Sequence, residues 1–408
     1  MTICPADQCT GCYACINACA HNCITMRVDD DGAYRPVIDE KLCTQCKLCV
    51  SSCPNNKELE FHYPIECFAS WITDVAKRKI CASGGIGTII GEYVLKNGGI
   101  LFGSRYDDNL RPIMTWTDNF SDIEKFKGSR YVQSYVGDHT FREVKKFLQS
   151  ERIVAFIGTP CQIAGLLSYL RCDYSNLITV DLICHGVCPT KYLDEEISYL
   201  KQKYQIQDLA DIRFRGNDGN NFRLSLWNKN MNKLFPRDTI REKILHEDVA
   251  EQYYIQGFLK GISMRENCYS CQYARPERVS DITIGDFIGL GRNLPFDYPT
   301  FNVSSVMINT PKGQIFYREL LQTMPTLKNI LRPYSERLEY RPSLLEPFER
   351  HQLNHVFLLL YKQVGFAKAI RTVMYEEMKR KQREYILNHW TYVYRIPRKM
   401  VKILLGKR

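Results

Sequence analysis

The sequence predicts a chain of three parts: a small α+β module, an α/β domain with a mostly parallel sheet, and a helical C-terminal tail. Eight of the 18 cysteines lie in two similar blocks before residue 60. From residue 79 onward, short apolar runs alternate with amphipathic segments, which favours a parallel sheet. We place the module at residues 1–60, the α/β domain at residues 65–145 and 146–330, and the tail at residues 347–408.

Apolar runs rich in β-branched residues predict the strands of the α/β domain. They are Ile100–Gly103, Arg152–Gly158, Leu177–Ile183, Asp281–Gly285 and Val303–Asn309. Amphipathic segments between them predict helices over Phe141–Leu148 and Gln162–Leu170, and another helix after Pro189. The polar, turn-rich stretch near residues 205–240 predicts an insertion, and from Pro347 onward the pattern is mainly helical.

The net charge of +10 is concentrated in the tail. Residues 351–408 hold 13 Lys or Arg and 3 Asp or Glu, so the rest of the chain is neutral overall. Because no basic stripe with interleaved aromatic residues crosses the other parts, we expect no nucleic-acid partner. Two interpretations of the tail remain open. It is either a basic amphipathic helix in peripheral contact with an anionic membrane, or a helical extension packed on the body. We favour the second.

Cysteine usage and the N-terminal sequence predict the compartment. The chain begins MTICPADQC, without the charged and apolar regions of a signal peptide. No apolar run reaches the roughly 18 residues of a membrane-spanning helix. Disulfide frameworks are typical of short secreted chains. We therefore expect a cytoplasmic protein, with the inner membrane reached only through the tail.

The two cysteine blocks share the spacing C-x2-C-x2-C-x3-C. Three thiolates of such a run converge on one cubane, and the fourth ligates the other cluster. A zinc site needs only four thiolates and does not account for two repeated groups of four. We therefore expect a ferredoxin-like module with two 4Fe–4S clusters that moves electrons one at a time, and Cys4 and Cys23 as spares. The expected ligand sets are Cys9, Cys12, Cys15 and Cys53 for the first cluster, and Cys19, Cys43, Cys46 and Cys49 for the second.

Four further cysteines form a weaker pattern in the α/β domain. Cys161 and Cys184 each follow a predicted buried strand, and Cys268 and Cys271 form C-x2-C. The carboxyl ends of parallel strands share one sheet edge, where ligands bind. A loop that brings C-x2-C to this edge completes four ligands. The alternative, a small zinc knuckle with two core cysteines, stays open.

Two glycine-containing segments suggest anion contacts. Ser83-Gly84-Gly85 precedes a helical stretch, and glycines at a helix N-terminus let backbone amides approach a phosphate. Neither a Rossmann nor a Walker pattern is present. Lys127-Gly128-Ser129-Arg130 is a second candidate cradle. A capped turn and an exposed charged turn are the respective alternatives.

Taken together and in order, these motifs resemble the coenzyme F-420 hydrogenase/dehydrogenase beta-subunit family, with a two-cluster ferredoxin domain in front. The resemblance runs from about residue 65 to 325. It implies an α/β flavin-binding domain that holds FAD, with the third 4Fe–4S cluster beside the flavin. The matching segments are Ser83–Gly85, Lys127–Ser134, Gly158-Thr159-Pro160-Cys161-Gln162, Cys184-His185-Gly186, Cys268–Cys271 and Ser280–Phe287. The flavin-binding residues it implies are Ser83, Gly84, Gly85, Lys127, Ser129, Arg130, Tyr131, Gln133, Ser134, Gly158 and Thr159.

The sequence departs from the family pattern at two places. Cys81-Ala82 stands where the family tends to have serines, so Cys81 is a candidate neighbour of the flavin. Val187-Cys188-Pro189 stands where the family tends to be proline-rich. Cys188 therefore competes with Cys184 as the expected cluster ligand.

These inferences predict an iron–sulfur flavoprotein oxidoreductase that passes single electrons between its clusters and FAD. We expect His185 and Asp286 to be the titratable residues near the flavin, and they are the candidate catalytic residues. Relatives with this layout resemble proteins encoded among surface-polysaccharide genes, which suggests a small-molecule or glycan-precursor acceptor. A redox partner protein or soluble donor is expected, whether ferredoxin, deazaflavin or NAD(P)H. The alternative is a non-catalytic electron-transfer subunit that serves a partner enzyme.

Overall fold

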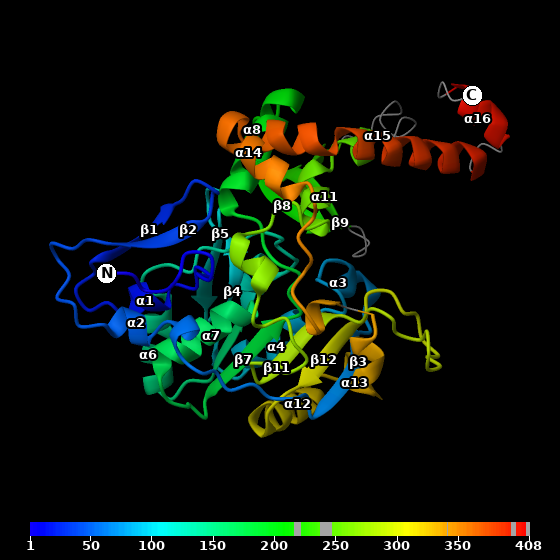
Figure 1. Ribbon diagram of the computed structural model, residues 1–408. Coiled ribbons are helices and arrows are strands. Elements are labelled where there is room, and N and C mark those ends of the chain that lie inside the picture. The colour runs from blue at the N-terminus through cyan, green and yellow to red at the C-terminus, as the bar shows by residue number, and fades with distance from the viewer. Residues whose placement is uncertain (216–221, 237–246, 341, 393–396, 405–408) are drawn as a thin grey trace. The chain divides into compact units, whose positions relative to one another are not determined.

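The computed structural model describes residues 1–408 except 216–221, 237–246, 341, 393–396 and 405–408 (Figure 1). The described chain forms two compact units. Unit 1 comprises residues 1–190, 215–221 and 264–349. Unit 2 comprises residues 191–214, 222–263 and 350–408. The dicluster cysteines and the four cysteines of the α/β domain all belong to unit 1.

An eight-stranded sheet forms the centre of unit 1, in the order β13-β3-β12-β11-β7-β6-β4-β5. The pairs β4–β6, β6–β7 and β7–β11 are parallel, whereas the outer pairings are antiparallel. The expected mostly parallel sheet is thus found at the centre, within a mixed sheet. The strands are β3 (Glu66–Ile72), β4 (Ile100–Tyr106), β5 (Pro112–Thr117), β6 (Val154–Gly158), β7 (Leu177–Leu182), β11 (Ile282–Asp286), β12 (Ser304–Ile308) and β13 (Leu327–Arg332).

Both faces of the central strands are buried, because successive side chains point to opposite faces. Phe102 and Phe156 join the core on one face, and Leu101 and Ala155 join the core on the other. Helices α6 (Thr140–Gln149) and α7 (Pro160–Leu170) pack on the first face. Helices α4 (Ile86–Lys96) and α12 (Pro311–Thr323) pack on the second. This explains why the strands are continuous apolar runs in the sequence.

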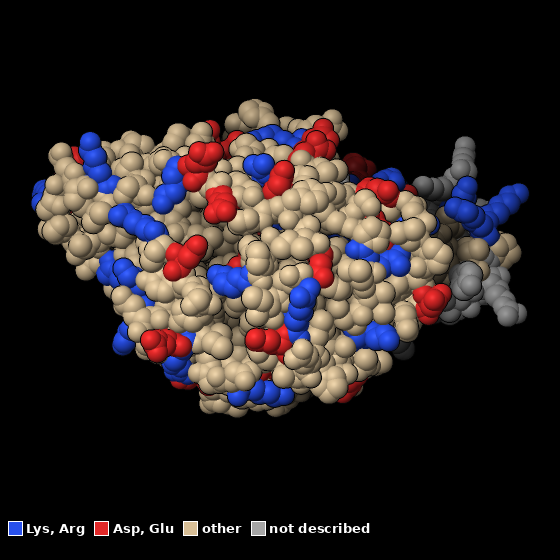
Figure 2. All heavy atoms as spheres, turned by 90° about the horizontal axis from the view of Figure 1, so that it is seen from below, with Lys and Arg blue, Asp and Glu red and all other residues tan. Residues whose placement is uncertain are grey.

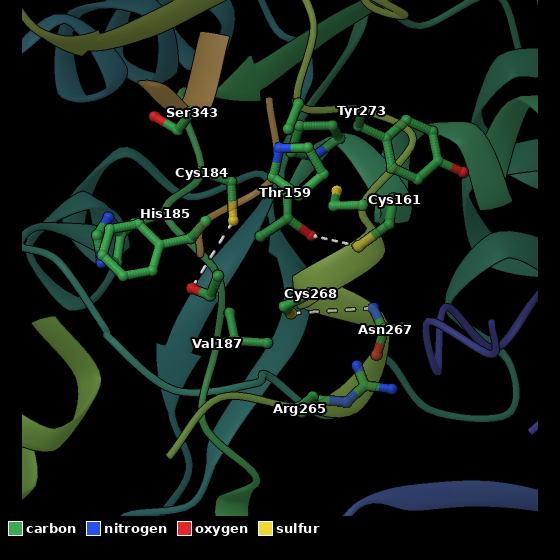
Figure 3. A pocket seen from close by; sticks show the side chains of 16 residues that line it. Thr159, Cys161, Cys184, His185, Val187, Arg265, Asn267, Cys268, Tyr273 and Ser343 are labelled. Carbon is green, nitrogen blue, oxygen red and sulfur yellow. Dashed lines mark hydrogen bonds between the residues drawn. The ribbon is translucent and has the colours of Figure 1, made fainter. Parts of the chain in front are cut away.

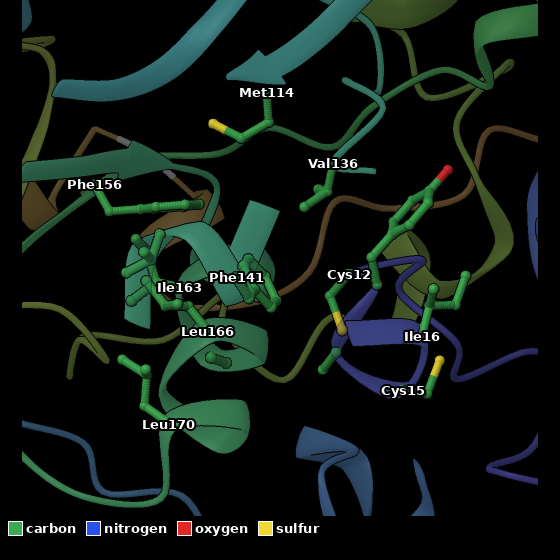
Figure 4. Close-up of a cluster of buried hydrophobic side chains, with 14 of the residues drawn as sticks. Cys12, Cys15, Ile16, Met114, Val136, Phe141, Phe156, Ile163, Leu166 and Leu170 are labelled. Carbon is green, nitrogen blue, oxygen red and sulfur yellow. The ribbon is translucent and has the colours of Figure 1, made fainter. Parts of the chain in front are cut away.

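The dicluster module packs on helices α6 and α7. Its α1 contacts both helices, and Tyr13 and Ile16 belong to the same apolar core as Phe141 and Ile163 (Figure 4). The Asn17 amide donates to the Gly137 carbonyl at 3.0 Å. The module therefore shares its core with the sheet. Its elements are α1 (Ala14–Ala18), β1 (Ile24–Val28), β2 (Tyr34–Ile38), α2 (Leu48–Ser51) and the 3-10 helix η1 (Pro54–Asn56).

Short elements complete unit 1. They are α3 (Val75–Lys79), η2 (Phe120–Asp122), α5 (Ile123–Phe126), η3 (Glu266–Ser270), α13 (Tyr334–Leu338) and η4 (Pro342–Leu344). Of these, η3 bears directly on function, because it carries Cys268 and its C-cap is Cys271.

Unit 2 combines the polar insertion with the C-terminal helices. Tyr192 on α8 stacks on Phe366 at 5.0 Å between ring centroids, and Arg371 pairs with the buried Glu196 at 2.7 Å. These contacts join residues that the sequence analysis placed in separate parts. The elements are α8 (Thr190–Tyr204), β8 (Leu209–Arg215), β9 (Phe222–Asn228), β10 (Lys233–Phe235), α10 (Glu247–Ala250), α11 (Tyr253–Leu259), α14 (Asn354–Val364), α15 (Phe366–Tyr392) and α16 (Arg398–Leu404), where α8 begins and β8 ends with a residue of unit 1.

Charged side chains of both signs are mixed on the surface. On the face drawn in Figure 2, Lys and Arg are interspersed with Asp and Glu, and no large area carries a single sign. Among the described residues, no helix is both long and apolar enough to span a membrane.

Candidate functional site

The two cysteine runs of the dicluster module repeat the same backbone geometry. Gly11 and Tyr13 have φ values of 58° and 67°, and Gln45 and Lys47, at the matching positions, have 58° and 61°. In each run a short helix then begins, at Ala14 and at Leu48. These left-handed turns fold each run into a tight loop, so the duplication seen in the sequence is also a duplication of structure.

The first run gathers its thiols in the shared core. Cys9, Cys12 and Cys15 are each buried, and burial raises the pKa of Cys12 to about 12, with a further rise from the neighbouring Cys9 and Cys161 thiols. The spare Cys4 interacts with both Cys9 and Cys53. The structure therefore brings Cys53, from the second run, to the cysteines of the first.

A pocket in the module is lined by its remaining cysteines. Cys19 and Cys23 lie in its wall with their sulfur atoms 3.4 Å apart. Burial and the neighbouring Cys19 and Cys43 raise the pKa of Cys23 to about 12. The crossing of the two runs is the arrangement expected of two clusters that exchange their fourth ligand. The cysteines lining the pocket are Cys19, Cys23, Cys43, Cys46 and Cys49.

The structure also brings the four cysteines of the α/β domain together (Figure 3). Cys161 lies in the first turn of α7 after β6, and Cys184 follows β7, so both are at the carboxyl edge of the parallel strands. Segment 264–274 completes the wall with Cys268 and Cys271. Together they line a cavity of about 40 Å³, several times the roughly 10–15 Å³ that one water molecule needs.

The structure separates Cys184 from Cys188. Cys184 lines the four-cysteine cavity, whereas Cys188 is fully buried, is not among the residues that line it, and accepts a backbone hydrogen bond from Gln133 at 3.1 Å. Of these two neighbouring cysteines, only Cys184 is placed to serve as a ligand in this cavity.

The donor set of this cavity fits a polynuclear cluster. Burial raises the pKa of the Cys184 thiol well above its ordinary value, and the nearby cysteine thiols raise it further. Four thiolates can share such a site only with a compensating positive centre. Four cysteine thiolates are the ligand set of a 4Fe–4S cluster, and the same set can also hold a structural zinc ion. Within the described ranges, no three His, Cys, Asp or Glu side chains gather closely enough to share one metal ion.

Polar groups beside the cavity reach its sulfur atoms. The Asn267 amide donates to the Cys268 sulfur at 3.9 Å, and the Thr159 hydroxyl lies 3.2 Å from the Cys161 sulfur. Hydrogen bonds to ligand sulfurs tune the potential of an iron–sulfur centre. Thr159, which the family resemblance assigned to the flavin, thus contacts Cys161 of the cavity.

Three residues that the sequence analysis missed connect the first dicluster site to this cavity. Arg265 and Tyr273 both line the cavity. Tyr273 also interacts with Cys12 and Cys53 of the module. Gly165 on α7 lies against Cys12. No sequence signal marks these residues, because their partners lie more than 100 positions away along the chain.

The two candidate catalytic residues have different surroundings. His185 lines the four-cysteine cavity, with its ring 4.1 Å from the Phe348 ring. Asp286, at the end of β11, forms a two-bond ion pair with Arg215 at 2.5 and 3.1 Å. Arg215 also donates to the Tyr131 hydroxyl at 2.9 Å, so it joins Tyr131 to Asp286. Sequence reasoning did not identify Arg215.

The Ser83-Gly84-Gly85 segment packs tightly against the sheet. The Gly84 amide donates to the Ser304 hydroxyl at 2.9 Å, and a Cβ at Gly84 would lie 2.3 Å from the Ser70 carbonyl oxygen. Gly85, with φ at 87°, is the N-cap of α4. These contacts account for both glycines through the close approach of α4 to β3 and β12. Cys81, nearby, is buried and donates to the Lys77 carbonyl at 3.2 Å.

The remaining expected flavin residues make various contacts. Lys127 pairs with Glu124, and the Arg130 guanidinium lies 4.9 Å from the Tyr106 ring centroid. The Gln133 amide donates to the Gly11 carbonyl at 3.3 Å, which places it against the dicluster module. The others are Ser129, which interacts with Tyr131, Ser134, which bonds Ser104, and Gly158, which ends β6.

Comparisons with known proteins identify two family domains in the chain. Residues 8–57 match the 4Fe–4S dicluster domain, and residues 151–328 match the family model for the C terminus of the coenzyme F-420 hydrogenase/dehydrogenase beta subunit. A chain of the xenon-derivatised F-420-reducing NiFe hydrogenase complex from Methanosarcina barkeri has 17% sequence identity and a TM-score of 0.44. That match covers 81% of this chain and 95% of the other. No curated protein matches the sequence.

Proposed function

We propose that this chain, a member of the coenzyme F-420 hydrogenase/dehydrogenase beta-subunit family with a 4Fe–4S dicluster domain, is an FAD-dependent enzyme with three 4Fe–4S clusters. Its family and its dicluster domain make it an iron–sulfur electron-transfer protein of the oxidoreductase type. When bound, the clusters accept and release one electron at a time, and FAD exchanges one or two. The ligands we propose for the third cluster are Cys161, Cys184, Cys268 and Cys271.

The contact between the first dicluster site and the four-cysteine cavity carries this proposal. Cys12 of the module lies against α7, the helix whose first turn holds Cys161. Tyr273 interacts with cysteines of both sites. Cys161 and Cys271 of the cavity pack against the same apolar core that contains Cys12. A chain that needed only a structural metal site would have no use for two adjoining thiolate sets.

We assign the flavin to the carboxyl edge of the sheet near the four-cysteine cavity. His185 lies in the cavity wall, and the Tyr131–Arg215–Asp286 group lies at the end of β11. The Asp286 carboxylate accepts two hydrogen bonds from the Arg215 guanidinium, so we assign Asp286 as a positioning group for Arg215. The acceptor that we propose is a small molecule, with a glycan precursor as the class that the family resemblance suggests.

The experiment is anaerobic purification of the full chain followed by iron, sulfide and flavin analysis. The proposal predicts close to one FAD per chain, and tenfold or weaker FAD binding in Lys127→Gln. Lys125→Gln is the matched control, because Lys125 lies two residues away, pairs with Asp122 and is exposed, whereas the Lys127 side chain is nearly buried. Cluster-loaded protein with no flavin absorbance, and no FAD binding by calorimetry, would contradict the flavoenzyme.

One observation favours a second candidate, a subunit that passes electrons to a partner enzyme. Asp286, one of the two titratable residues that the sequence analysis expected near the flavin, is held in a bidentate ion pair with Arg215 and is not free to transfer a proton. A pure electron-transfer subunit needs no such proton donor. Full cluster content without flavin, together with electron transfer to an added redox protein, is the outcome that this candidate predicts.

A further inference from the structure

Arg265 spans the two thiolate sites of unit 1, and its role there rests on the proposed three-cluster function. Its guanidinium donates to the carbonyl of Thr10 at 2.5 Å and to that of Cys9 at 3.0 Å, in the first cysteine run. The same side chain lines the four-cysteine cavity (Figure 3). Arg265 is thus in contact with both sites.

The main chain of Arg265 belongs to the wall of the four-cysteine cavity. Its amide donates to the Val187 carbonyl at 3.0 Å, and its carbonyl accepts from the Cys268 amide at 3.0 Å. The residue is therefore fixed by its backbone in one site and by its side chain in the other. Any shift between the two sites must break one of these sets of bonds.

The charge of Arg265 has no carboxylate partner among the described residues. The side chain is only 2% exposed, and its Nε atom makes no hydrogen bond within the described part of the chain. A buried charge is costly unless an opposite charge compensates it. Its bonds to the Thr10 and Cys9 carbonyls place it beside the first cysteine run, and its position in the cavity wall places it beside Cys161 and Cys268.

Gly11 in the first cysteine run makes room for the Arg265 side chain. A Cβ at Gly11 would lie 2.6 Å from the Gln133 amide nitrogen and 3.2 Å from a terminal nitrogen of Arg265. Gly11 also has φ at 58°, a conformation that glycine adopts without strain. The glycine in the first cysteine run thus admits the guanidinium to the carbonyl groups of Cys9 and Thr10.

We propose that Arg265 is a positioning residue that serves as the shared countercharge of the first dicluster cluster and the four-cysteine cluster, and that it raises the reduction potentials of both. A 4Fe–4S core with four thiolates is anionic, and reduction adds one more negative charge. A fixed cation in a water-excluded region favours that added charge more strongly than it would in water. Because one cation faces both sites, it raises both potentials together.

Arg142 provides the matched control. Its guanidinium also donates to carbonyl groups of the first run, those of Asn17 at 2.8 Å and Cys19 at 2.6 Å. It is on α6, is less buried than Arg265, and is not among the residues that line the four-cysteine cavity. Replacing Arg142 therefore removes comparable hydrogen bonds to the module without removing a charge from the cavity.

The test is an anaerobic redox titration of the full-length protein, in which electron paramagnetic resonance monitors the reduction of each cluster. The signal of the four-cysteine cluster is identified as the one missing from Cys271→Ala. In Arg265→Gln, both affected centres should show at least a tenfold smaller equilibrium constant for reduction, a fall of about 59 mV or more for a one-electron couple. Iron content should be unchanged. Arg142→Gln should leave the potential of the four-cysteine cluster unchanged.

Two results would overturn the role of Arg265 while leaving the three-cluster function intact. These are unchanged potentials in an iron-loaded Arg265→Gln protein, and an equal shift of the four-cysteine cluster in Arg142→Gln. If Arg265→Gln loses iron, Arg265→Lys is the deciding variant, because lysine retains the positive charge. Potentials close to those of the wild type in Arg265→Lys support the proposal. A tenfold fall in the equilibrium constant for reduction contradicts it. Absence of the four-cysteine signal from wild-type protein would instead contradict the proposed function itself.

Discussion

Cys12 lies directly against Gly165: a Cβ at Gly165 would be 2.8 Å from the Cβ and 2.9 Å from the sulfur of Cys12. The contact joins the first cysteine run to the middle of α7, whose first turn contains Cys161. A cluster ligand cannot move aside as a flexible side chain does, so no larger residue fits at position 165. The glycine sets how closely the two thiolate sites approach.

Gly165→Ala should therefore disturb the first cluster, although alanine is the better helix former. We expect a partial loss of iron and a weaker magnetic interaction between the first and the four-cysteine clusters, both measurable by iron analysis and electron paramagnetic resonance. Gly87→Ala in α4 is the control, because a Cβ there meets only Ile284 at 3.5 Å, an ordinary contact. Equal iron content and equal coupling in the two variants would contradict the close-approach role.

Cys184→Ala should release the third cluster, and Cys188→Ala should retain it. Cys184 lines the four-cysteine cavity, whereas Cys188 is fully buried and is not among the residues that line it. We expect the iron content to fall by about four per chain in the first variant only. Both substitutions remove one thiol from the same loop, and Cys188 is the more buried of the two, so Cys188→Ala controls for packing loss. Iron loss confined to Cys188→Ala would show that the ligand is Cys188.

The second dicluster site should tolerate the loss of either Cys19 or Cys23, but not of both. Their sulfur atoms are 3.4 Å apart and line the same pocket as Cys43, Cys46 and Cys49. Each single alanine variant should keep its iron, because the remaining thiol reaches the same corner of the cluster. The double variant should lose about four irons. Loss of iron in Cys19→Ala alone would mean that Cys23 cannot replace it.

The buried ion pair between Arg278 and Asp181 should be important for stability. Their side chains are 2% and 0% exposed and 2.9 Å apart, and Arg278 also donates to the Tyr273 carbonyl beside the four-cysteine cavity. Arg278→Met leaves a buried carboxylate uncompensated, so we expect the free energy of unfolding to fall by about 3–5 kcal/mol. Arg380→Met, at an exposed pair with Glu384, should change it by less than about 1 kcal/mol.

The loss in Arg278→Met should also depend on pH. Burial raises the pKa of Asp181, and Arg278 counteracts that rise. Without Arg278 the folded protein binds this proton still more strongly than the unfolded chain does. Stability is therefore lost as the pH rises from the ordinary aspartate pKa of about 3.9 through the raised value. Urea unfolding of cluster-loaded protein should show the gap from wild type widening with pH; a constant gap would contradict this account.

Local spacing made the grouping of the dicluster cysteines predictable from the sequence. The turns that gather Cys9, Cys12 and Cys15 lie within seven residues, so the pattern itself encodes the geometry. Cys161 and Cys184 were predictable for another reason: each follows a buried strand, and adjacent parallel strands end at one edge. The central strands were recognisable because both of their faces are buried.

Long-range contacts could not be predicted in this way. Strand β3 pairs with β12 and β13, more than 230 residues away, and its own pattern does not reveal that position in the sheet. Arg265 is 255 residues from the carbonyl of Thr10 that it binds. Ser83 to Gly85 suggested a phosphate site, whereas in the structure these residues bring α4 close to the sheet. Glycine marks a close approach without identifying what approaches.

The central claim, that three 4Fe–4S clusters share this chain, is tested most directly by counting iron and acid-labile sulfide in the full-length protein purified without oxygen. The full chain is needed because Tyr13 and Ile16 of the module are part of the core of unit 1. We predict about twelve irons and twelve sulfides per chain, falling to about eight of each in Cys271→Ala. About eight of each in the wild-type protein, unchanged in Cys271→Ala, would contradict the third cluster.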